Sequence, residues 1–475
     1  MNCDIGIYGL GIMGQNLSLN FADKGYRVTV YNRTEAGEEE VTDNFIKSRC
    51  LGKNIFGAGD VIKFVNSIRL PRKILMMVKS GEPVDDILEQ LIILLDPGDI
   101  VIDGGNSHYL DTTRRLVRME TLGFLFIGCG ISGGGEGALL GPSIMLGGSI
   151  QAWEPVRLMF QAISAKTEEG TSSCNWVGPE GSGHLVKMVH NGIEYALMQM
   201  LAESYDVMKR MLEMSTKEIH DILAEWCDGE LQSYLLRITL AILDTQDENG
   251  YPLIDKVLDC AMHKNSGKNT SIASIEMGIP ATTITEAVNA RYLSMLLDER
   301  HLVSKEYICR KQYNGDRQTI LTALHDALCC SNLIAYIQGF SLITKSSEVN
   351  GWNIVLPLVA NIWRNGSIIQ SDVLNTIAEI LDKTIEEHLV LDCNIKEKIE
   401  QYQRGWRDAI MAAVDCGIPV PTMSAALGYF DGLRSEQLPT NLIQAQRDYF
   451  GVHGFELRVQ PRGDILHSSW GRNPG

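Results

Sequence analysis

Three glycines that follow the first apolar run constrain the fold of this chain more than any other feature. The run Ile5-Gly-Ile-Tyr8 reads as a β-strand and leads into Gly9-x-Gly11-x-x-Gly14, which opens a helical pattern. The motif alone is weak evidence, but its place on the first strand of a βαβ unit makes it strong evidence of a dinucleotide site. Gly9 permits the tight turn, Gly11 admits a pyrophosphate to the backbone, and Gly14 lets helix and strand pack closely. The expected coenzyme contacts in this turn are Gly9, Leu10, Gly11, Ile12, Met13 and Gly14.

The end of the second predicted strand indicates which dinucleotide binds. An NAD site usually places Asp or Glu here to hold the ribose 2′-hydroxyl. This chain has Asn32, Arg33 and Thr34 instead. A guanidinium suits a 2′-phosphate, so the sequence favours NADP over NAD. The alternative is that Arg33 is an ordinary residue of a surface turn.

Short β-rich runs alternate with amphipathic stretches over residues 1–180, which predicts a parallel, doubly wound, Rossmann-like domain. From residue 181 long helical patterns take over and predict a large all-α domain over 181–440. Glycine and proline make the tail, 441–475, irregular. The predicted strands are Cys3–Tyr8, Arg27–Tyr31, Ile74–Val78, Asp99–Ile102 and Phe124–Gly128, and the main helical patterns cover 184–213, 217–244, 316–345, 371–392 and 396–415.

Charge and composition argue against several classes of protein. A net charge of -17 argues against non-specific binding of nucleic acid, and it requires a local Lys/Arg cluster for any anionic substrate. No uninterrupted apolar run reaches transmembrane length, and the start of the chain lacks a signal pattern, so we expect a cytoplasmic protein without a membrane partner. The cysteines form no CxxC pair, which is typical of free thiols in a reducing compartment. Histidines and carboxylates show no ligand spacing, so no metal is expected.

Three further loops follow predicted strands at the edge of the sheet where ligands bind in such folds. They are Val78-Lys79-Ser80-Gly81, then Asp103-Gly-Gly-Asn106-Ser107, and then Ser132-Gly133-Gly134-Gly135-Glu136-Gly137. The backbone N–H groups of the glycine-rich loop can cradle a carboxylate. The same glycines also suit a flexible turn, but their position after a strand favours a ligand site.

One predicted helix carries polar groups where a core-facing helix would carry apolar ones. Lys187, His190, Asn191, Glu194 and Tyr195 stand at i, i+3, i+4, i+7 and i+8, so all five lie on or near one face. The stripe holds a possible base, a possible acid and three hydrogen-bonding groups. A solvated face with a salt-bridged lysine and glutamate is the alternative.

These motifs together resemble the 6-phosphogluconate dehydrogenase family, the decarboxylating branch of the β-hydroxyacid dehydrogenases. The resemblance runs essentially from end to end. It implies an NADP-dependent oxidative decarboxylation of 6-phosphogluconate in the pentose phosphate pathway, in a homodimer with shared active sites. The blocks that carry the resemblance are Asn32-Arg-Thr34, Asp103-Gly-Gly-Asn-Ser107, Ser132-Gly-Gly134, Lys187-Met-Val-His-Asn-Gly-Ile-Glu-Tyr195 and Gln444-Ala-Gln-Arg-Asp-Tyr-Phe-Gly451.

The resemblance also implies a role for each matching residue. Lys187 is expected to be the general base and Glu194 the general acid. Arg447 and His453 are expected to enter the active site of the partner subunit, and the all-α domain is expected to form the dimer. The implied substrate contacts are Asn106, Ser132, Gly133, Gly134, His190, Asn191, Tyr195, Lys264, Arg291, Arg447 and His453, and the coenzyme contacts add Asn32, Arg33, Thr34, Val78, Lys79, Ser80 and Asn106 to the glycine turn.

Some positions depart from the pattern of the family, although none of them removes a proposed catalytic group. A non-decarboxylating β-hydroxyacid dehydrogenase and a non-catalytic NADP-binding relative therefore remain as alternatives. The departures are Gly135, Leu146, Asn265, Asn269, Asn365 and Gln370.

Overall fold

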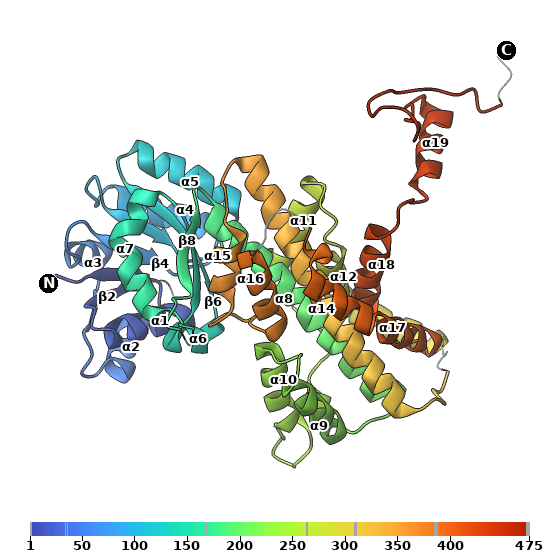
Figure 1. Ribbon diagram of the computed structural model, residues 1–475. Helices are drawn as coiled ribbons and strands as arrows, with labels where there is room; N and C mark the ends of the chain where they lie inside the picture. Colours follow the sequence, from blue (N-terminus) through green and yellow to red (C-terminus); the bar gives the residue numbers. More distant parts are fainter. Residues whose placement is uncertain are drawn as a thin grey trace. The chain divides into compact units, whose positions relative to one another are not determined.

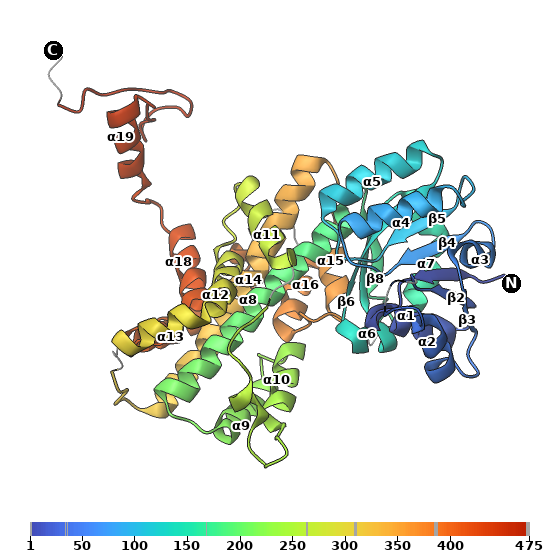
Figure 2. The same cartoon turned by 180° about the vertical axis from the view of Figure 1, so that it is seen from behind.

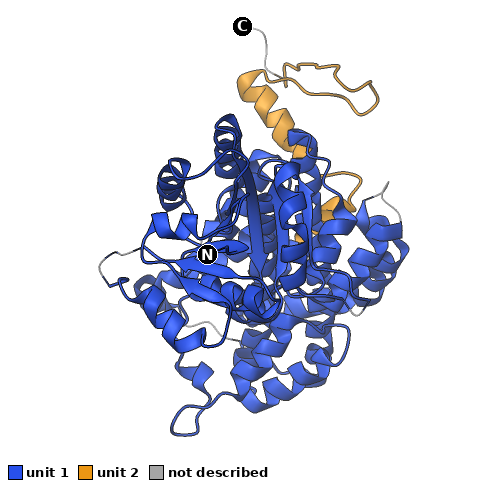
Figure 3. Ribbon diagram, turned by 90° about the vertical axis from the view of Figure 1, so that its left-hand side faces the viewer, with its two compact units in different colours: residues 1–426 blue, residues 427–475 orange. Residues whose placement is uncertain are grey.

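The computed structural model describes residues 2–33, 35, 37–167, 169–262, 265–307, 311–383 and 388–471 (Figure 1). Two predicted site residues, Thr34 and Lys264, lie outside this set. The chain forms two compact units, Met1–Ala426 and Leu427–Gly475, which Figure 3 shows in blue and orange. We describe each unit by itself.

The first unit begins with an eight-stranded sheet in the order β3-β2-β1-β4-β5-β6-β7-β8. The strands from β3 to β6 are parallel, and their order is that of a dinucleotide-binding sheet, which confirms the predicted Rossmann-like fold. The predicted strands pair in parallel as expected, whereas β7, which was not predicted, runs antiparallel to β6, and β8 is parallel to β7. The strands are β1 (Ile5–Tyr8), β2 (Val28–Tyr31), β3 (Ile55–Gly57), β4 (Lys73–Met76), β5 (Ile100–Asp103), β6 (Leu125–Ser132), β7 (Ser143–Gly148) and β8 (Cys174–Gly178).

Helices cover both faces of this sheet, as Figures 1 and 2 show. One core packs α1 and α7 against the sheet through Phe21, Trp153 and Phe160. The other packs α3, α4 and α5 against the opposite face. These apolar faces, each removed from water, supply most of the stabilisation of the domain. The helices are α1 (Ile12–Asp23), α2 (Val41–Arg49), α3 (Val61–Asn66), α4 (Glu82–Ile92), α5 (Tyr109–Thr121), α6 (Gly134–Leu140) and α7 (Ile150–Ile163).

The remainder of the first unit is helical, which confirms the predicted all-α region. The single helical pattern predicted over 217–244 is in fact two helices, because Ser233 accepts a hydrogen bond from the N–H of Leu236 and caps a new start. The helices are α8 (Ser182–Asp206), α9 (Thr216–Cys227), α10 (Tyr234–Asp244), α11 (Asn265–Glu276), α12 (Thr282–Met295), α13 (Leu297–Glu306), α14 (Arg317–Asn350), α15 (Leu356–Trp363), α16 (Asp372–Lys383) and α17 (Cys393–Asp415), and α18 (Pro421–Leu433) spans the boundary of the units.

Close glycine contacts hold α8 in the centre of this unit. A Cβ on Gly183 would lie 2.5 Å from the backbone nitrogen of Gly147 in β7. Similar approaches bring α11 against Gly192 and bring Gly339 of α14 against Ile193. The long helix α14 has the length and apolarity to cross a membrane, but 78% of its most apolar window is buried inside the protein. It is therefore a core helix of this unit.

A buried carboxylate joins the far end of α8 to the start of α18. Glu203 is 2% exposed and accepts hydrogen bonds from the N–H groups of Thr422 (2.9 Å) and Met423 (3.0 Å). Burial raises the pKa of Glu203 to about 7, although the two N–H groups act in the opposite direction. This contact makes the packing of α18 on α8 sensitive to pH.

After the end of α18, the second unit contains one further helix, α19 (Thr440–Gly451), among the residues that the structure describes there. The irregular tail predicted from 441 therefore begins with a helix, because the helix-breaking glycines appear only from Gly451 onward. Asp448 of α19 accepts hydrogen bonds from Gly454, Ser468 and Trp470 and so holds the following part of the tail against the helix.

Candidate active site

The glycine turn between β1 and α1 has the form that a dinucleotide requires. Gly9 has a φ of +103°, and a Cβ there would lie 2.5 Å from the carbonyl oxygen of Met77. A Cβ on Gly14 would overlap the carbonyl oxygen of Gly9, so both positions need glycine. A Cβ on Gly11 would meet no described atom within 4 Å. The backbone is therefore open at Gly11, where a pyrophosphate would approach the start of α1.

A cleft of about 510 Å³ opens beside this turn at the carboxyl ends of β1, β2 and β4. Several predicted coenzyme contacts line it, whereas Ile12, Met13, Gly14 and Ser80 lie outside its lining. The lining contains two cations, Arg33 and Lys79, and three carboxylates, Glu35, Glu38 and Asp86. The predicted contacts that line the cleft are Gly9, Leu10, Gly11, Asn32, Arg33, Val78 and Lys79.

The segment after β2 is linked to the glycine turn by Asn32. Its side-chain oxygen accepts a hydrogen bond from the N–H of Leu10 at 3.0 Å, and its amide nitrogen donates to Glu38 at 3.0 Å. Arg33 lies at the surface with 51% of its side chain exposed, and pairs with Glu35 (3.0 Å) and Glu38 (3.2 Å). The guanidinium that was predicted to meet a 2′-phosphate is therefore held between two carboxylates.

Two loops of the site share one buried arginine. Arg115 of α5 is 1% exposed and donates to the carbonyl oxygen of Gly81 at 2.9 Å, which ends the Val78–Ser80 loop. It also donates to Ser107 (3.1 Å) and lies 3.4 Å from Asp103, and both of these belong to the loop after β5. The carboxylate of Asp85 in α4 is a further partner of Arg115, with 2.7 Å between Oδ2 and Nη2. The guanidinium of Arg115 lowers the pKa of Asp85 to about 2.

Arg115 was not among the predicted site residues, although its spacing on α5 contains a signal. Thr112, Arg115, Leu116 and Met119 are all buried and stand at i, i+3, i+4 and i+7 of one helix. A charged residue on such a stripe requires buried partners, because an isolated ion in the interior is strongly unfavourable. The loop Asp103–Ser107 supplies them.

The polar stripe on α8 is buried, so the alternative of a solvated face is excluded. Lys187 is 6% exposed, His190 0% and Asn191 9%. The Lys187 ammonium nitrogen donates to the side-chain oxygen of Asn191 and lies 3.5 Å from Nδ1 of His190. Glu194 is one turn further along, with its carboxylate 3.7 Å from the same His190 nitrogen and 21% of its side chain exposed. The structure therefore brings the predicted base, acid and two amide or imidazole groups together.

His190 joins α8 to the glycine-rich loop. Its Nε2 is 2.9 Å from the hydroxyl of Ser132 at the end of β6, and the same hydroxyl accepts from the N–H of Ile368 at 3.2 Å. Burial and the neighbouring Lys187 charge hold the pKa of His190 well below its usual range. The imidazole is therefore neutral at physiological pH. Gly133 and Gly134 follow in left-handed conformations, with φ of +118° and +64°, and begin α6.

A small hollow connects the stripe with the loop after β5. It is about 10 Å³, close to the size of one water molecule. Its walls come from that loop, from α8 and from α11. The lining residues are Asn106, Ser107, His108, His184, Lys187, Met188, Asn191, Ser266 and Asn269.

Tyr195 and Arg291 form the next layer beyond Asn191. The guanidinium carbon of Arg291 lies 3.4 Å from the centre of the Tyr195 ring, a stacked cation–π arrangement. Burial lowers the pKa of Arg291, while the charge of Glu194 raises it. This places one predicted phosphate ligand beside the predicted acid.

The predicted tail residues lie in the second unit. Arg447 donates to the side chain of Gln444 at 3.1 Å, and His453 is exposed on a hollow of about 480 Å³. The solvent exposure of both side chains leaves them accessible to another molecule.

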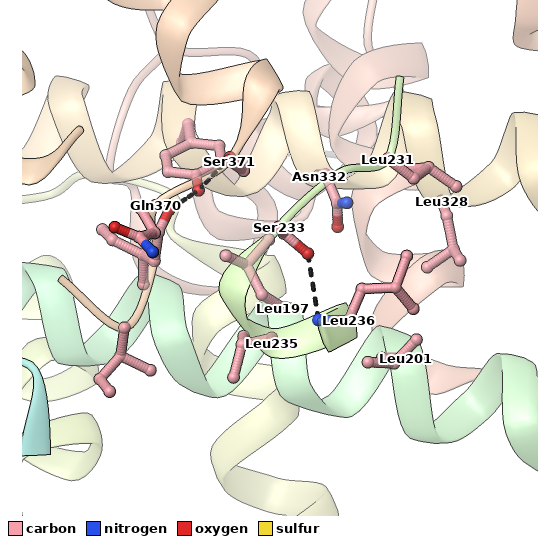
Figure 4. A pocket seen from close by; sticks show the side chains of 13 residues that line it. Leu197, Leu201, Leu231, Ser233, Leu235, Leu236, Leu328, Asn332, Gln370 and Ser371 are labelled. Atoms are coloured by element: carbon pink, nitrogen blue, oxygen red, sulfur yellow. Dashed lines mark hydrogen bonds between the residues drawn. The ribbon is translucent and has the colours of Figure 1, made fainter. Parts of the chain in front are cut away.

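Another pocket, shown in Figure 4, does not fit a charged ligand. It measures about 30 Å³ and is lined by leucines with Ser233, Asn332 and Gln370, with no ionisable carboxylate or cation among its lining residues. The side-chain oxygen of Asn332 has no hydrogen-bond partner in the described part of the chain, which suits one bound water. No group of three possible metal ligands occurs among the described residues.

Comparison with known proteins decides the family. Residues 183–470 match the model of the 6-phosphogluconate dehydrogenase C-terminal domain, and residues 4–178 match the NAD binding domain of 6-phosphogluconate dehydrogenase. This chain belongs to the 6-phosphogluconate dehydrogenase family. The Treponema pallidum protein named 6-phosphogluconate dehydrogenase, decarboxylating, is 45% identical over 481 residues, 99% of this chain and 97% of that protein.

Two further relatives support the same family assignment. The human protein of the same name is 44% identical over 470 residues, covering 98% of this chain and 96% of that protein. A solved structure of the Plasmodium falciparum 6-phosphogluconate dehydrogenase, described in its apo form and in complexes with NADP+ and with 6-phosphogluconate, superposes with a TM-score of 0.93. It is 35% identical and covers 98% of this chain and 100% of that one.

The departures from the family pattern lie around the site without entering the Lys187 cluster. Gly135 accepts a hydrogen bond from Asn16 at 2.7 Å through its carbonyl oxygen, which joins α6 to α1. Gln370 accepts one from the N–H of Gly366 at 2.9 Å, and Leu146 is buried in β7. Asn269 alone lines the hollow beside Lys187. For Asn265 and Asn365 the structure shows no specific consequence in the described region.

Proposed function

We propose that this chain catalyses the oxidative decarboxylation of 6-phospho-D-gluconate to D-ribulose 5-phosphate and CO2, with reduction of NADP to NADPH. The single observation that carries the proposal is the buried cluster of Lys187, Asn191 and His190, which shares a hollow with the loop after β5. That loop stands at the sheet edge that also carries the glycine turn. The names of the full-length relatives and the NADP+ and 6-phosphogluconate complexes of the Plasmodium protein support it.

The first step needs a base at the C3 hydroxyl of the substrate. When bound, NADP supplies the hydride acceptor. Lys187 can take the hydroxyl proton only as a free amine, and its low exposure provides the dry setting that this role requires. Asn191 orients the amine through a hydrogen bond, and neutral His190 stands ready to contact the substrate without competing for the proton. Oxidation at C3 leaves a β-keto acid.

Loss of CO2 then moves an electron pair towards the C3 oxygen. The newly protonated Lys187 can stabilise the charge that develops on this oxygen. The enediol that remains must take up a proton at the carbon that carried the lost carboxylate, which becomes C1 of the ribulose 5-phosphate. Glu194 lies two turns from Lys187 on the same helix, so it can donate this proton. Because its side chain is partly exposed, it can then take up a new proton from solvent.

The phosphate end of the substrate needs several cations, because the protein as a whole is negatively charged. Arg291 is proposed to supply one of them from its position on Tyr195. Lys264 and Thr34, which lie outside the described residues, remain proposed contacts for the substrate and the coenzyme.

We further propose a cytoplasmic homodimer in which the tail of each subunit, 441–475, brings Arg447 and His453 to the partner's site. Apolar side chains on the tail support this. Leu442 is 61% exposed and Phe450 72%, which is unfavourable for a surface that stays in water. On this proposal residues 1–180 bind NADP and residues 181–440 bind the substrate and form the dimer.

The proposal is tested with purified protein, NADP+ and 6-phosphogluconate. Absorbance of NADPH and release of CO2 are followed together, and equal amounts of both are expected. NADPH without CO2 would instead indicate a non-decarboxylating dehydrogenase. The absence of both products at saturating substrate would indicate a non-catalytic relative.

The role of Lys187 is tested by Lys187→Ala. Oxidation should fall by about three orders of magnitude or more, since a general base alone contributes about 10²–10⁴-fold and the charge stabilisation is lost as well. NADP+ binding, measured by titration, should stay within about twofold, because Lys187 lies outside the lining of the coenzyme cleft. Turnover within tenfold of the unmodified protein contradicts the base role.

A further inference from the structure

The surroundings of Arg33 are acidic, which is unexpected for a site selective for a 2′-phosphate. All three nitrogens of its guanidinium have a carboxylate partner. Nη1 donates to Glu35 at 3.0 Å, while Nε and Nη2 donate to the two oxygens of Glu38 at 3.2 and 3.4 Å. Glu38 is also fixed by Asn32, which in turn holds the N–H of Leu10 in the glycine turn.

The charge of Glu38 persists at neutral pH. Its hydrogen bonds from Arg33 and then from Asn32 lower its pKa, so the carboxylate is ionised wherever the coenzyme binds. With Glu35 and Asp86 it gives the cleft lining three anions against the two cations Arg33 and Lys79. A 2′-phosphate is itself negatively charged, so it gains little binding free energy from the Arg33 guanidinium when two carboxylates already pair with that group.

The same carboxylate offers what an NAD ribose needs. In sheets of this type an acidic side chain just after the second strand accepts a hydrogen bond from the ribose 2′-hydroxyl, whereas an arginine accommodates the 2′-phosphate. This chain has both groups within contact distance of each other, on the lining of one cleft. Because surface ion pairs of this kind are weak, the phosphate can still displace Glu38.

We propose that Glu38 determines the coenzyme specificity of this chain by pairing with Arg33, so that the advantage of NADP over NAD is reduced and both dinucleotides bind. The proposal rests on the proposed function of the cleft as the coenzyme site. It predicts a smaller preference for NADP than Arg33 alone would give.

The test compares Glu38→Gln with a matched control in the same segment. Glutamine keeps the size of the side chain and can still accept from Arg33, but it removes the charge. Glu39→Gln removes the same charge one residue further on, where the carboxylate accepts from the N–H of Gly37 and makes no described contact with Arg33. Both residues lie at the surface segment before α2, so neither change is expected to unfold the protein.

Dissociation constants of NADP+ and NAD+ are measured by calorimetric titration of the apo protein. For the unmodified chain both nucleotides should bind. Glu38→Gln should raise the ratio of the NAD+ constant to the NADP+ constant about tenfold, since a unit charge a few ångströms from a phosphate at the protein surface corresponds to about 1 kcal/mol or more. Glu39→Gln should change the ratio less than about twofold, because its charge is further away and screened.

Two results overturn the proposal. One is an unchanged ratio in Glu38→Gln, and the other is a Glu39→Gln ratio that moves as far as that of Glu38→Gln, which would make the effect one of overall charge. Both results leave the proposed function intact when the unmodified chain still binds NADP+. An unmodified chain that binds neither nucleotide refutes the proposed function and this inference together.

Discussion

Replacing Arg115 with methionine removes the cation that holds two loops of the active site. Methionine is unbranched and fills much of the same space, so the change tests charge and hydrogen bonding more than packing. The variant loses the donor to Gly81 (2.9 Å), the donor to Ser107 (3.1 Å) and the pair with Asp85 (2.7 Å). Asp103, which is fully buried, loses its counter-charge.

The expected loss of unfolding free energy depends on which hydrogen-bond and ion-pair partners the two carboxylates retain. Breaking a buried ion pair by removing one partner typically costs about 3–5 kcal/mol. Asp103 retains hydrogen bonds from Ser107 (2.7 Å) and Gly105 (3.1 Å), and Asp85 retains Arg114 at 3.1 Å. We therefore expect the lower end, about 3 kcal/mol of unfolding free energy. A domain of ordinary stability stays folded after such a loss.

Urea titrations followed by tryptophan fluorescence measure this loss, with Arg115→Met compared against Arg115→Met/Asp103→Asn. In the double variant the buried carboxylate is replaced by a neutral amide of the same shape. It should recover about 1–2 kcal/mol, since most of the single-variant cost is the unpaired charge. The reasoning is refuted if the single variant loses less than about 1 kcal/mol, or if the second substitution recovers nothing.

Other predictions concern single positions. Gly11→Ala should leave the melting temperature within about 1 °C, because the added Cβ meets no described atom within 4 Å. It should nevertheless weaken NADP+ binding at least about tenfold, because the methyl group blocks the approach of the pyrophosphate. Equal binding of NADP+ by both proteins would show that the coenzyme approaches elsewhere. Arg291→Ala should raise the KM for 6-phosphogluconate about tenfold or more while kcat changes little, as expected for a binding cation, and a fall in kcat alone would remove it from that role. Burial raises the pKa of Glu203 from an unfolded value near 4.5 to about 7, so its contribution to stability is fully present below pH 4.5 and is lost as the pH rises through 7. Between pH 5 and 8 the melting temperature should therefore fall less steeply in Glu203→Gln than in the unmodified protein. Parallel curves for the two proteins would contradict this assignment.

Much of the fold followed from local patterns. The glycine turn, the alternation of strands and helices and the long helices all produce strong periodic signals. β3 was missed because it has only three residues. β7 was missed because Gly147 and Gly148 interrupt its apolar pattern. Residues 133–142 between β6 and β7 are too few for a parallel crossover, which needs about a dozen or more, so the antiparallel edge follows once β7 is known.

The site was harder to predict where partners are distant in sequence. Lys187, His190 and Asn191 share one helix, so spacing alone brought them together. The contact of His190 with Ser132 crosses 58 positions, and that of Ser132 with Ile368 crosses 236. Arg33 was identified, but the pairing of its guanidinium with Glu38 depends on the turn that separates them. Local patterns identify which groups are present, and only the folded chain shows which of them neutralise one another.

The start of α8 has a consequence for how new specificities can arise. Because Gly183 lies against the backbone of Gly147, the start of the helix that carries Lys187 is fixed directly on the sheet. This contact between two backbones leaves no room for a side chain at either glycine. On the proposed function, redesign toward another hydroxy acid therefore has to leave these first turns unchanged and alter the residues of α11 that line the hollow beside Lys187.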